Sequence, residues 1–156
     1  MYETLIWATD GSDGADLALD EALHLAELSG GRIVAVHCDQ RLNGRAMGWP
    51  ALPDEEDRRI KIRRQVAELT ATGVDIEVVI RKSHREAADI VAAIAAELGG
   101  DVIVCGTRGQ GALAGAFLGS FTQRLLHVAP CPVLAVSERE AKRSATRKRE
   151  KTKVGA

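Results

Sequence analysis

The segment from Gly106 to Ser120 holds the residue types in this sequence that are best suited to chemistry. It contains five glycines, and a pattern typical of a helix begins at Ser120. Glycine lets backbone N–H groups approach oxygen atoms that a Cβ would keep away, and a helix N-terminus adds free N–H donors and the positive end of the helix dipole. The segment therefore predicts a binding site for phosphate groups, with the Ser120 hydroxyl as a further donor at the helix cap.

Several common phosphate-binding motifs do not fit this sequence. The glycine-rich segment has no Gly-Lys-Ser/Thr, which excludes a P-loop, and the turn after the first apolar run, ATDGSDG, lacks the G-x-G-x-x-G of nicotinamide-binding Rossmann domains. A phospho-receiver domain is excluded because the run at 74–81 ends in Arg81 and Lys82 without an acceptor Asp. The four histidines are widely spaced and the three cysteines show no close pairing, so we expect neither a metal site nor a disulfide framework.

The rest of the chain reads as strands that alternate with helices. Short apolar runs predict strands at 4–10, 32–39, 74–81, 101–106 and 131–136. Helical spacing of apolar residues predicts helices between Ser12 and Gly30, over 54–72, between Ser83 and Gly99, and over 120–129. Ser12 is the expected cap of the first helix, and Ser83 with Glu86 forms a capping-box pattern for the third.

This alternation predicts an α/β fold with a parallel, Rossmann-like sheet between layers of helices. Ligands of such sheets bind outside the carboxyl ends of the strands, at the point where the strand order reverses. The loops after Asp10, Asp39 and Gly106 are therefore the places where we expect a ligand. His37 is close to one of these loops, and we expect it to be a hydrogen-bonded structural histidine.

Composition limits the class of protein further. A chain of 156 residues with 46% hydrophobic residues can bury a single core, which indicates one domain. No apolar run approaches the ~20 residues of a membrane-spanning helix, and a strand-like run already begins at Thr4. We therefore expect a cytoplasmic protein with no signal peptide and no membrane partner.

Charge follows two patterns along the chain. The predicted helix at 54–72 has acidic-first pairs at i,i+4 spacing, which indicate a solvated face rather than a binding surface: Asp54/Arg58, Glu55/Arg59 and Asp57/Lys61. Residues 137–156 carry 8 Lys or Arg against 3 Asp or Glu, with almost no apolar side chains. We expect the domain to occupy 1–136 and 137–156 to be a disordered basic tail. Since the tail has no interleaved aromatic residues, nucleic acid is not an expected partner.

The glycine-rich segment also matches a family pattern. Gly106, Gly109, Gly119 and Ser120 fill G-x-x-G-x9-G-S, which resembles the ATP-binding signature of universal stress proteins. The resemblance covers 3–136 and includes DGS at 10–12, VHC at 36–38 and TQRLLHVAPCPVLAV at 122–136. It implies an open five-stranded parallel sheet of the adenine nucleotide alpha hydrolase-like type, with strand order 3-2-1-4-5 and helices on both faces. It also implies a homodimer that forms through the fifth strand.

The resemblance further implies that the ligand is ATP, with any Mg or Mn carried by the phosphates. Asp10 would lie beside the adenosine, and Ala8 would leave room beneath the nucleotide. Thr9 would also belong to the nucleotide site, and the strand end at Cys38 would offer backbone contacts to adenine. The ribose and phosphates would be held by Gly106, Thr107, Arg108, Gly109, Gly111 and Ala112. The terminal phosphates would lie against Gly119, Ser120 and Phe121, where the Gly119 N–H would close over them in a backbone geometry that only glycine accepts easily.

Three functions remain open from the sequence. The first is an ATP-binding regulatory module in stress response, for which related adenine nucleotides such as cyclic AMP are also possible ligands. The second is a slow ATPase, although the glycine-rich segment contains no Glu or His that could act as a base. The third is a ligand-free structural or adaptor dimer.

Overall fold

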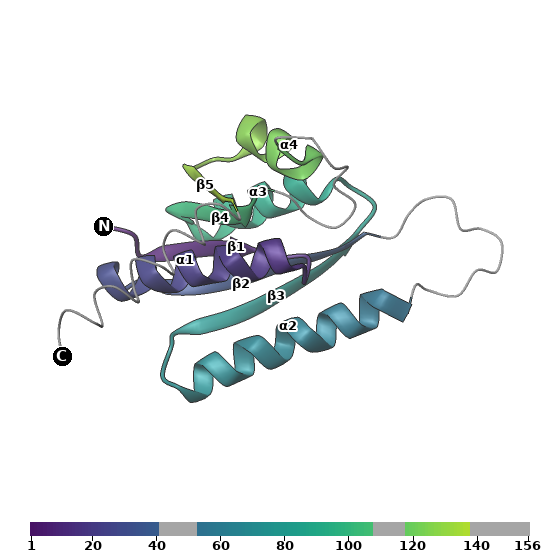
Figure 1. Ribbon diagram of the computed structural model, residues 1–156. Coiled ribbons are helices and arrows are strands. Elements are labelled where there is room, and N and C mark those ends of the chain that lie inside the picture. Colours follow the sequence, from purple (N-terminus) through teal and green to yellow (C-terminus); the bar gives the residue numbers. More distant parts are fainter. Residues whose placement is uncertain (41–52, 108–117, 138–156) are drawn as a thin grey trace.

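The computed structural model describes residues 1–40, 53–107 and 118–137 (Figure 1). Strands and helices alternate along these residues as β1 (Thr4–Ala8), α1 (Asp13–Ser29), β2 (Arg32–Gln40), α2 (Pro53–Ala71), β3 (Ile76–Ser83), α3 (Ala87–Leu98), β4 (Val102–Gly106), α4 (Ser120–Val128) and β5 (Val133–Val136). The predicted basic tail lies outside the described residues. Among the residues that the structure describes, no helix is long and apolar enough to cross a membrane.

The five strands form one parallel sheet in the order β3-β2-β1-β4-β5, which confirms the expected α/β fold and strand order. The central strand is β1, where Trp7 pairs with Ala35 of β2 on one side and with Val104 of β4 on the other. Every residue of β1 is buried. The chain leaves β1 toward β2 and later returns to the opposite side of β1 as β4, so the strand order reverses between β1 and β4.

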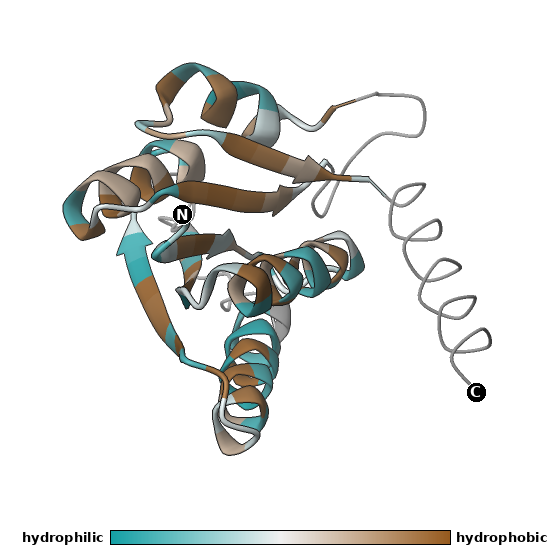
Figure 2. Ribbon diagram, turned by 90° about the vertical axis from the view of Figure 1, so that its left-hand side faces the viewer, coloured by the Kyte–Doolittle hydropathy of each residue, from teal (hydrophilic) through white to brown (hydrophobic). Residues whose placement is uncertain are grey.

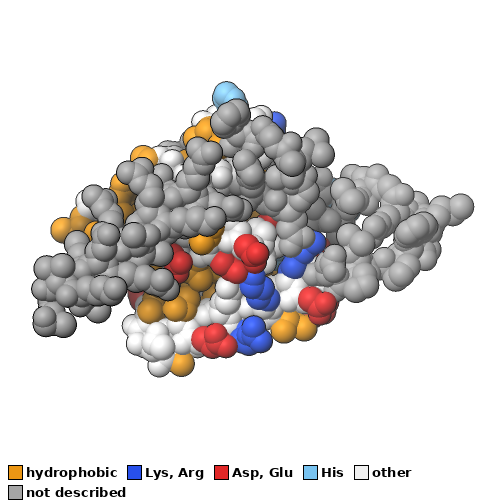
Figure 3. All heavy atoms as spheres, in the orientation of Figure 1, with side chains coloured by type: hydrophobic (Ala, Val, Ile, Leu, Met, Phe, Trp, Pro, Cys, Tyr) orange, Lys and Arg blue, Asp and Glu red, His pale blue; other side chains and the backbone are white. Residues whose placement is uncertain are grey.

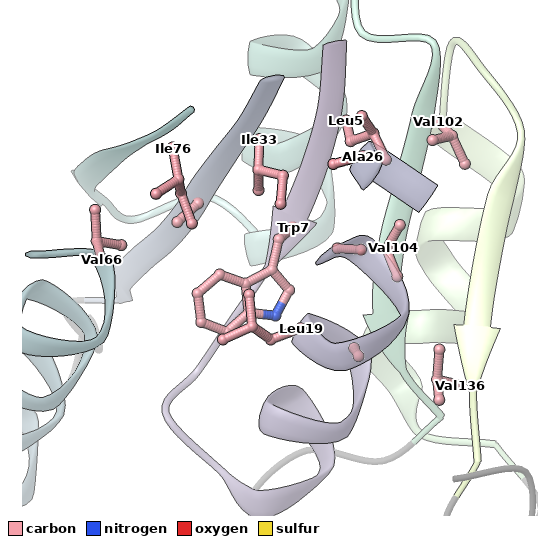
Figure 4. Close-up of a cluster of buried hydrophobic side chains, with 13 residues drawn as sticks. Leu5, Trp7, Leu19, Ala26, Ile33, Val66, Ile76, Val102, Val104 and Val136 are labelled. Atoms are coloured by element: carbon pink, nitrogen blue, oxygen red, sulfur yellow. The ribbon is translucent and has the colours of Figure 1, made fainter. Parts of the chain in front are cut away.

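Helices cover both faces of the sheet because successive strand side chains point to opposite sides. Leu5 and Trp7 of β1 pack with α1 and α2, whereas Ile6 and Ala8 pack with α3 and α4. Figure 2 shows strands that are largely hydrophobic and helices that mix hydrophobic and hydrophilic residues, as this layered arrangement requires. The large ring of Trp7 lies against Leu19 (Figure 4), and its indole N–H donates to the Ala15 carbonyl at 2.9 Å.

Local residue chemistry sets most of the helix ends. The Ser12 side chain accepts from the Ala15 amide and caps α1, as predicted, and Gly30 ends that helix with φ 71°. The capping box expected for α3 is wrong, since Glu86 occupies the N-cap position without a side-chain hydrogen bond. Ser83 is instead the last residue of β3, and its hydroxyl accepts from the Arg85 amide at 3.0 Å.

The third strand begins and ends two residues later than the sequence predicts. The chain turns at Gly73, whose φ is 92°, and the Val74 amide then donates to the Leu69 carbonyl at 3.2 Å. These bonds keep the residues after α2 in a turn, so pairing with β2 starts only at Ile76. It continues to Ser83 because β2 itself extends to Gln40.

Candidate functional site

The candidate site lies at the carboxyl ends of β1 and β4, on either side of the point where the strand order reverses. The chain segments that meet this edge are the loop after β1, the residues directly after β4 and the start of α4. Four residues that the sequence predicts for this site lie outside the described residues: Arg108, Gly109, Gly111 and Ala112.

The loop after β1 is held by its own backbone and side chains. The Thr9 amide donates to the Val36 carbonyl at 3.0 Å, which extends the pairing of β1 with β2 by one residue. The Gly11 amide donates to the Thr9 hydroxyl at 3.1 Å, and the Ser12 amide donates to Asp10 Oδ1 at 3.0 Å. Gly11 has φ 76°, a left-handed conformation that glycine adopts without a Cβ penalty. Asp10 therefore shapes the entry to α1 and also stands at the expected ligand edge.

The two predicted adenine-side residues on the strands share one face of the sheet. Ala8 is buried and Cys38 is half-buried, and both belong to the side that α3 and α4 cover. The Cys38 thiol donates to the Ala87 carbonyl at 3.7 Å, and burial raises the pKa of this thiol to about 11. The thiol is therefore neutral at physiological pH. Trp7 points to the opposite face of the sheet.

Two hydrogen bonds bring the last residue of β4 and the residue after it together with the start of α4. The Gly119 amide donates to the Thr107 carbonyl at 2.8 Å, and the Thr122 hydroxyl donates to the Gly106 carbonyl at 3.0 Å. Thr122 is 1% exposed, so its hydroxyl bond is protected from water. These bonds join both ends of the glycine-rich segment, as its proposed role requires.

A third contact holds α4 against α3. The Arg124 guanidinium donates to both carboxylate oxygens of Asp89, at 3.0 and 2.8 Å. The hydrogen bond from Arg124 is the main reason that the pKa of Asp89 lies below its usual value. Phe121 packs from α4 against the apolar cluster on this side of the sheet.

The expected geometry at Gly119 and Ser120 is wrong in two respects. Gly119, not Ser120, is the N-cap of α4, and no side chain caps the helix. Gly119 has φ −71° and ψ 156°, an extended conformation that any residue adopts. Its amide donates to the Thr107 carbonyl, so the amides that have no acceptor within the helix begin at the next residue. The first bond within the helix runs from Gln123 to the Gly119 carbonyl, which leaves the amides of Ser120, Phe121 and Thr122 without an acceptor inside α4.

Sequence reasoning missed a polar network that connects α2 with the loop after β1. The charges of α2 were expected to form a solvated face, but the Lys61 ammonium donates to the Gly11 carbonyl at 2.8 Å and to Asp16 Oδ2 at 2.6 Å. His37 contacts the Thr9 carbonyl at 2.9 Å and Glu55 Oε1 at 2.7 Å. Figure 3 shows acidic and basic side chains next to one another over the side of the molecule where α1 and α2 lie. A histidine on an apolar strand was the one sequence signal that pointed to this network.

This arrangement is chemically suited to binding an anion. The amides at the start of α4 that have no acceptor within the helix can each donate to an oxygen atom, and the helix dipole favours negative charge at this end. Among the described residues, no group of three or more His, Cys, Asp or Glu side chains could hold a metal ion.

Comparisons with known proteins place this chain in a family. The model of the universal stress protein family matches residues 1–137. A universal stress protein of Thermus aquaticus, named for its position in the QAH/OAS sulfhydrylase 3' region, is 38% identical over 138 residues, which cover 87% of this chain and 99% of the relative. The chain therefore belongs to the universal stress protein family.

Two solved structures show similar folds. One is a universal stress protein described in complex with cAMP, with a TM-score of 0.65 and 25% identity over 86% of this chain and 97% of that one. The other is a universal stress protein of Archaeoglobus fulgidus in complex with dAMP, with a TM-score of 0.63 and 22% identity over 86% of this chain and 97% of that one. Both neighbours thus bind adenine nucleotides.

Proposed function

We propose that this protein binds ATP at the edge formed by β1, β4 and α4, and that it acts as a nucleotide-dependent regulatory module in the cytoplasmic stress response. The observation that carries the proposal is the start of α4, where three amides lack an acceptor within the helix. Bonds from Gly119 to Thr107 and from Thr122 to Gly106 hold these amides beside the end of β4. The cAMP complex of the neighbour at 25% identity supports an adenine nucleotide as the ligand class.

In this proposal the nucleotide lies across the point between β1 and β4 where the strand order reverses. The adenosine part of ATP contacts Ala8, Thr9, Asp10 and the backbone at Cys38. The ribose and inner phosphates contact Gly106, Thr107, Arg108, Gly109, Gly111 and Ala112. The terminal phosphates accept hydrogen bonds from the start of α4, at Ser120 and Phe121 next to Gly119. Mg or Mn, when bound, is carried by the phosphates and neutralises part of their charge.

Two measurements test this function. Mass spectrometry of small molecules released from freshly purified protein is expected to recover an adenine nucleotide. Calorimetric titration should then show that ATP binds at least tenfold more tightly than adenosine, because only ATP reaches the amides of α4. A tenfold ratio corresponds to ~1.4 kcal/mol. Equal affinity for ATP and adenosine would contradict the proposed phosphate site. If neither compound binds, the result would favour a ligand-free structural or adaptor dimer.

We also propose that two copies associate through β5. This strand is the edge of the sheet beyond β4, and Leu134 within it is 38% exposed. An edge strand that carries an exposed apolar side chain favours pairing with a second copy.

A further inference from the structure

His37 lies between two hydrogen-bond acceptors. The residue is 2% exposed, with Nδ1 at 2.9 Å from the Thr9 carbonyl and Nε2 at 2.7 Å from Glu55 Oε1. A neutral imidazole has one N–H donor and one bare nitrogen, so either tautomer leaves a nitrogen lone pair facing an oxygen. Both contacts become favourable when the pair of His37 and Glu55 holds one more proton, as an imidazolium that faces a carboxylate.

Lys61 holds the same loop at a second point. Its ammonium donates to the Gly11 carbonyl at 2.8 Å and to Asp16 Oδ2 at 2.6 Å, while Gln65 Nε2 donates to Asp16 Oδ1 at 2.9 Å. The carbonyls on both sides of Asp10, those of Thr9 and Gly11, are therefore each bound by a side chain from the α1/α2 side of the sheet. The backbone at Asp10 is held from both ends.

Other charged groups surround the pair of His37 and Glu55. From α2, Arg58 Nη1 lies 3.5 Å from Glu55 Oε2, and Arg59 Nη1 lies 3.7 Å from Asp39 Oδ2 next to the end of β2. Asp16 of α1 is paired with Lys61 of α2, Glu56 of α2 is paired with Arg59, and Lys82 of β3 is in register with Asp39. Asp10 follows Thr9 in the loop. The carboxylate of Glu55 is the charged group in contact with the His37 ring, at 2.7 Å from Nε2.

We propose that His37, Glu55 and Lys61 are positioning residues for nucleotide binding, and that His37 and Glu55 must share an added proton to hold Asp10 in place. The inference rests on the proposed function, because Asp10 is taken as a contact of the adenosine part of ATP. Loss of the proton sets a nitrogen lone pair against the Thr9 carbonyl or against Glu55, which loosens the loop. Nucleotide affinity then falls as pH rises.

Glu55→Gln separates this effect from the ligand's own titration. A Gln amide can donate to Nε2 of a neutral His37 while Nδ1–H donates to the Thr9 carbonyl, so this variant needs no added proton. ATP is titrated by calorimetry into the full-length wild type and the variant at several values between about pH 5.5 and 8.5. The ratio of the two affinities cancels the protonation of ATP itself. The wild type is expected to lose at least threefold in affinity relative to Glu55→Gln across this range.

Lys61→Met tests the contact of Lys61 with the Gly11 carbonyl and leaves His37 and Glu55 unchanged. It should weaken ATP binding at least threefold at every pH, whereas Arg64→Met, on the exposed side of the same helix, should leave the affinity unchanged. Parallel pH profiles of the wild type and Glu55→Gln, or wild-type affinity in a folded Lys61→Met protein, would overturn the inference while leaving the proposed function intact. Absence of ATP binding by the wild type at every pH would overturn both.

Discussion

The Ser120 amide has no acceptor within α4 and stands at the first helical position, which makes it the most direct probe of the phosphate site. Proline is well tolerated at this position, because its missing N–H leaves no helical bond broken. It also requires an extended residue before it, and Gly119 already has φ −71° and ψ 156°. Ser120→Pro should therefore remove one phosphate donor and leave the helix in place.

We expect Ser120→Pro to weaken ATP binding at least tenfold, ~1.4 kcal/mol, with adenosine affinity unchanged. Ser120→Ala is the matched control, since it keeps the amide and removes only the exposed hydroxyl, and should cost less. Calorimetric titration measures both effects, and circular dichroism reports helix content. Equal ATP affinity in the two variants would show that the α4 amides do not contact phosphate.

One contact between elements holds the start of α4 at the candidate site. The buried Thr122 hydroxyl joins α4 to the end of β4 through the Gly106 carbonyl. Thr122→Val keeps the side-chain shape but leaves that carbonyl without this donor, so the protein should lose about 1 to 3 kcal/mol of stability. ATP affinity should fall several-fold as the start of α4 moves away from β4. Thr122→Ser keeps the hydroxyl and should bind ATP several-fold more tightly than Thr122→Val; urea denaturation and calorimetry make the comparison.

The start of β1 is joined to β4 by Asp101. Its Oδ2 accepts from the amides of Glu3 and Thr4 at 2.7 and 2.9 Å, and these bonds, led by that from Thr4, lower the pKa of the carboxyl. A lowered folded-state pKa contributes stability that is present above the unfolded pKa of about 3.9 and is lost as pH falls through the folded value. Asp101→Asn should therefore show a smaller loss of thermal stability between neutral and acidic pH than the wild type. Identical acid dependence would mean that Asp101 does not couple protonation to folding.

At the scale of the whole molecule, the exposed edge at β5 predicts how copies associate. Leu134→Lys places a charge on this edge, which disfavours strand pairing, and should convert a dimer to a monomer in light scattering. Leu126→Lys is the control, since Leu126 is 54% exposed on α4, outside the edge strand. A dimer that persists in Leu134→Lys would place the interface elsewhere.

Much of this molecule follows from residues that are close together in the chain. Apolar runs and helical spacing predicted the alternation of strands and helices, and Ser12 and Gly30 marked the ends of α1, because capping bonds form within a few residues. The family pattern added the strand order, which the structure confirms. The glycine-rich segment was correctly placed between β4 and α4 for the same local reason.

The contacts that complete the candidate site depend on the packing of distant segments. Helical spacing assigned Lys61 to Asp57, yet its ammonium lies against Gly11, 50 residues away, because α2 packs beside the start of α1. Local sequence patterns likewise could not predict the bond from Gly119 to Thr107 or the contact of His37 with Glu55. A long polar side chain binds whichever group the packed elements bring within ~3 Å, so its partner is decided by the tertiary structure.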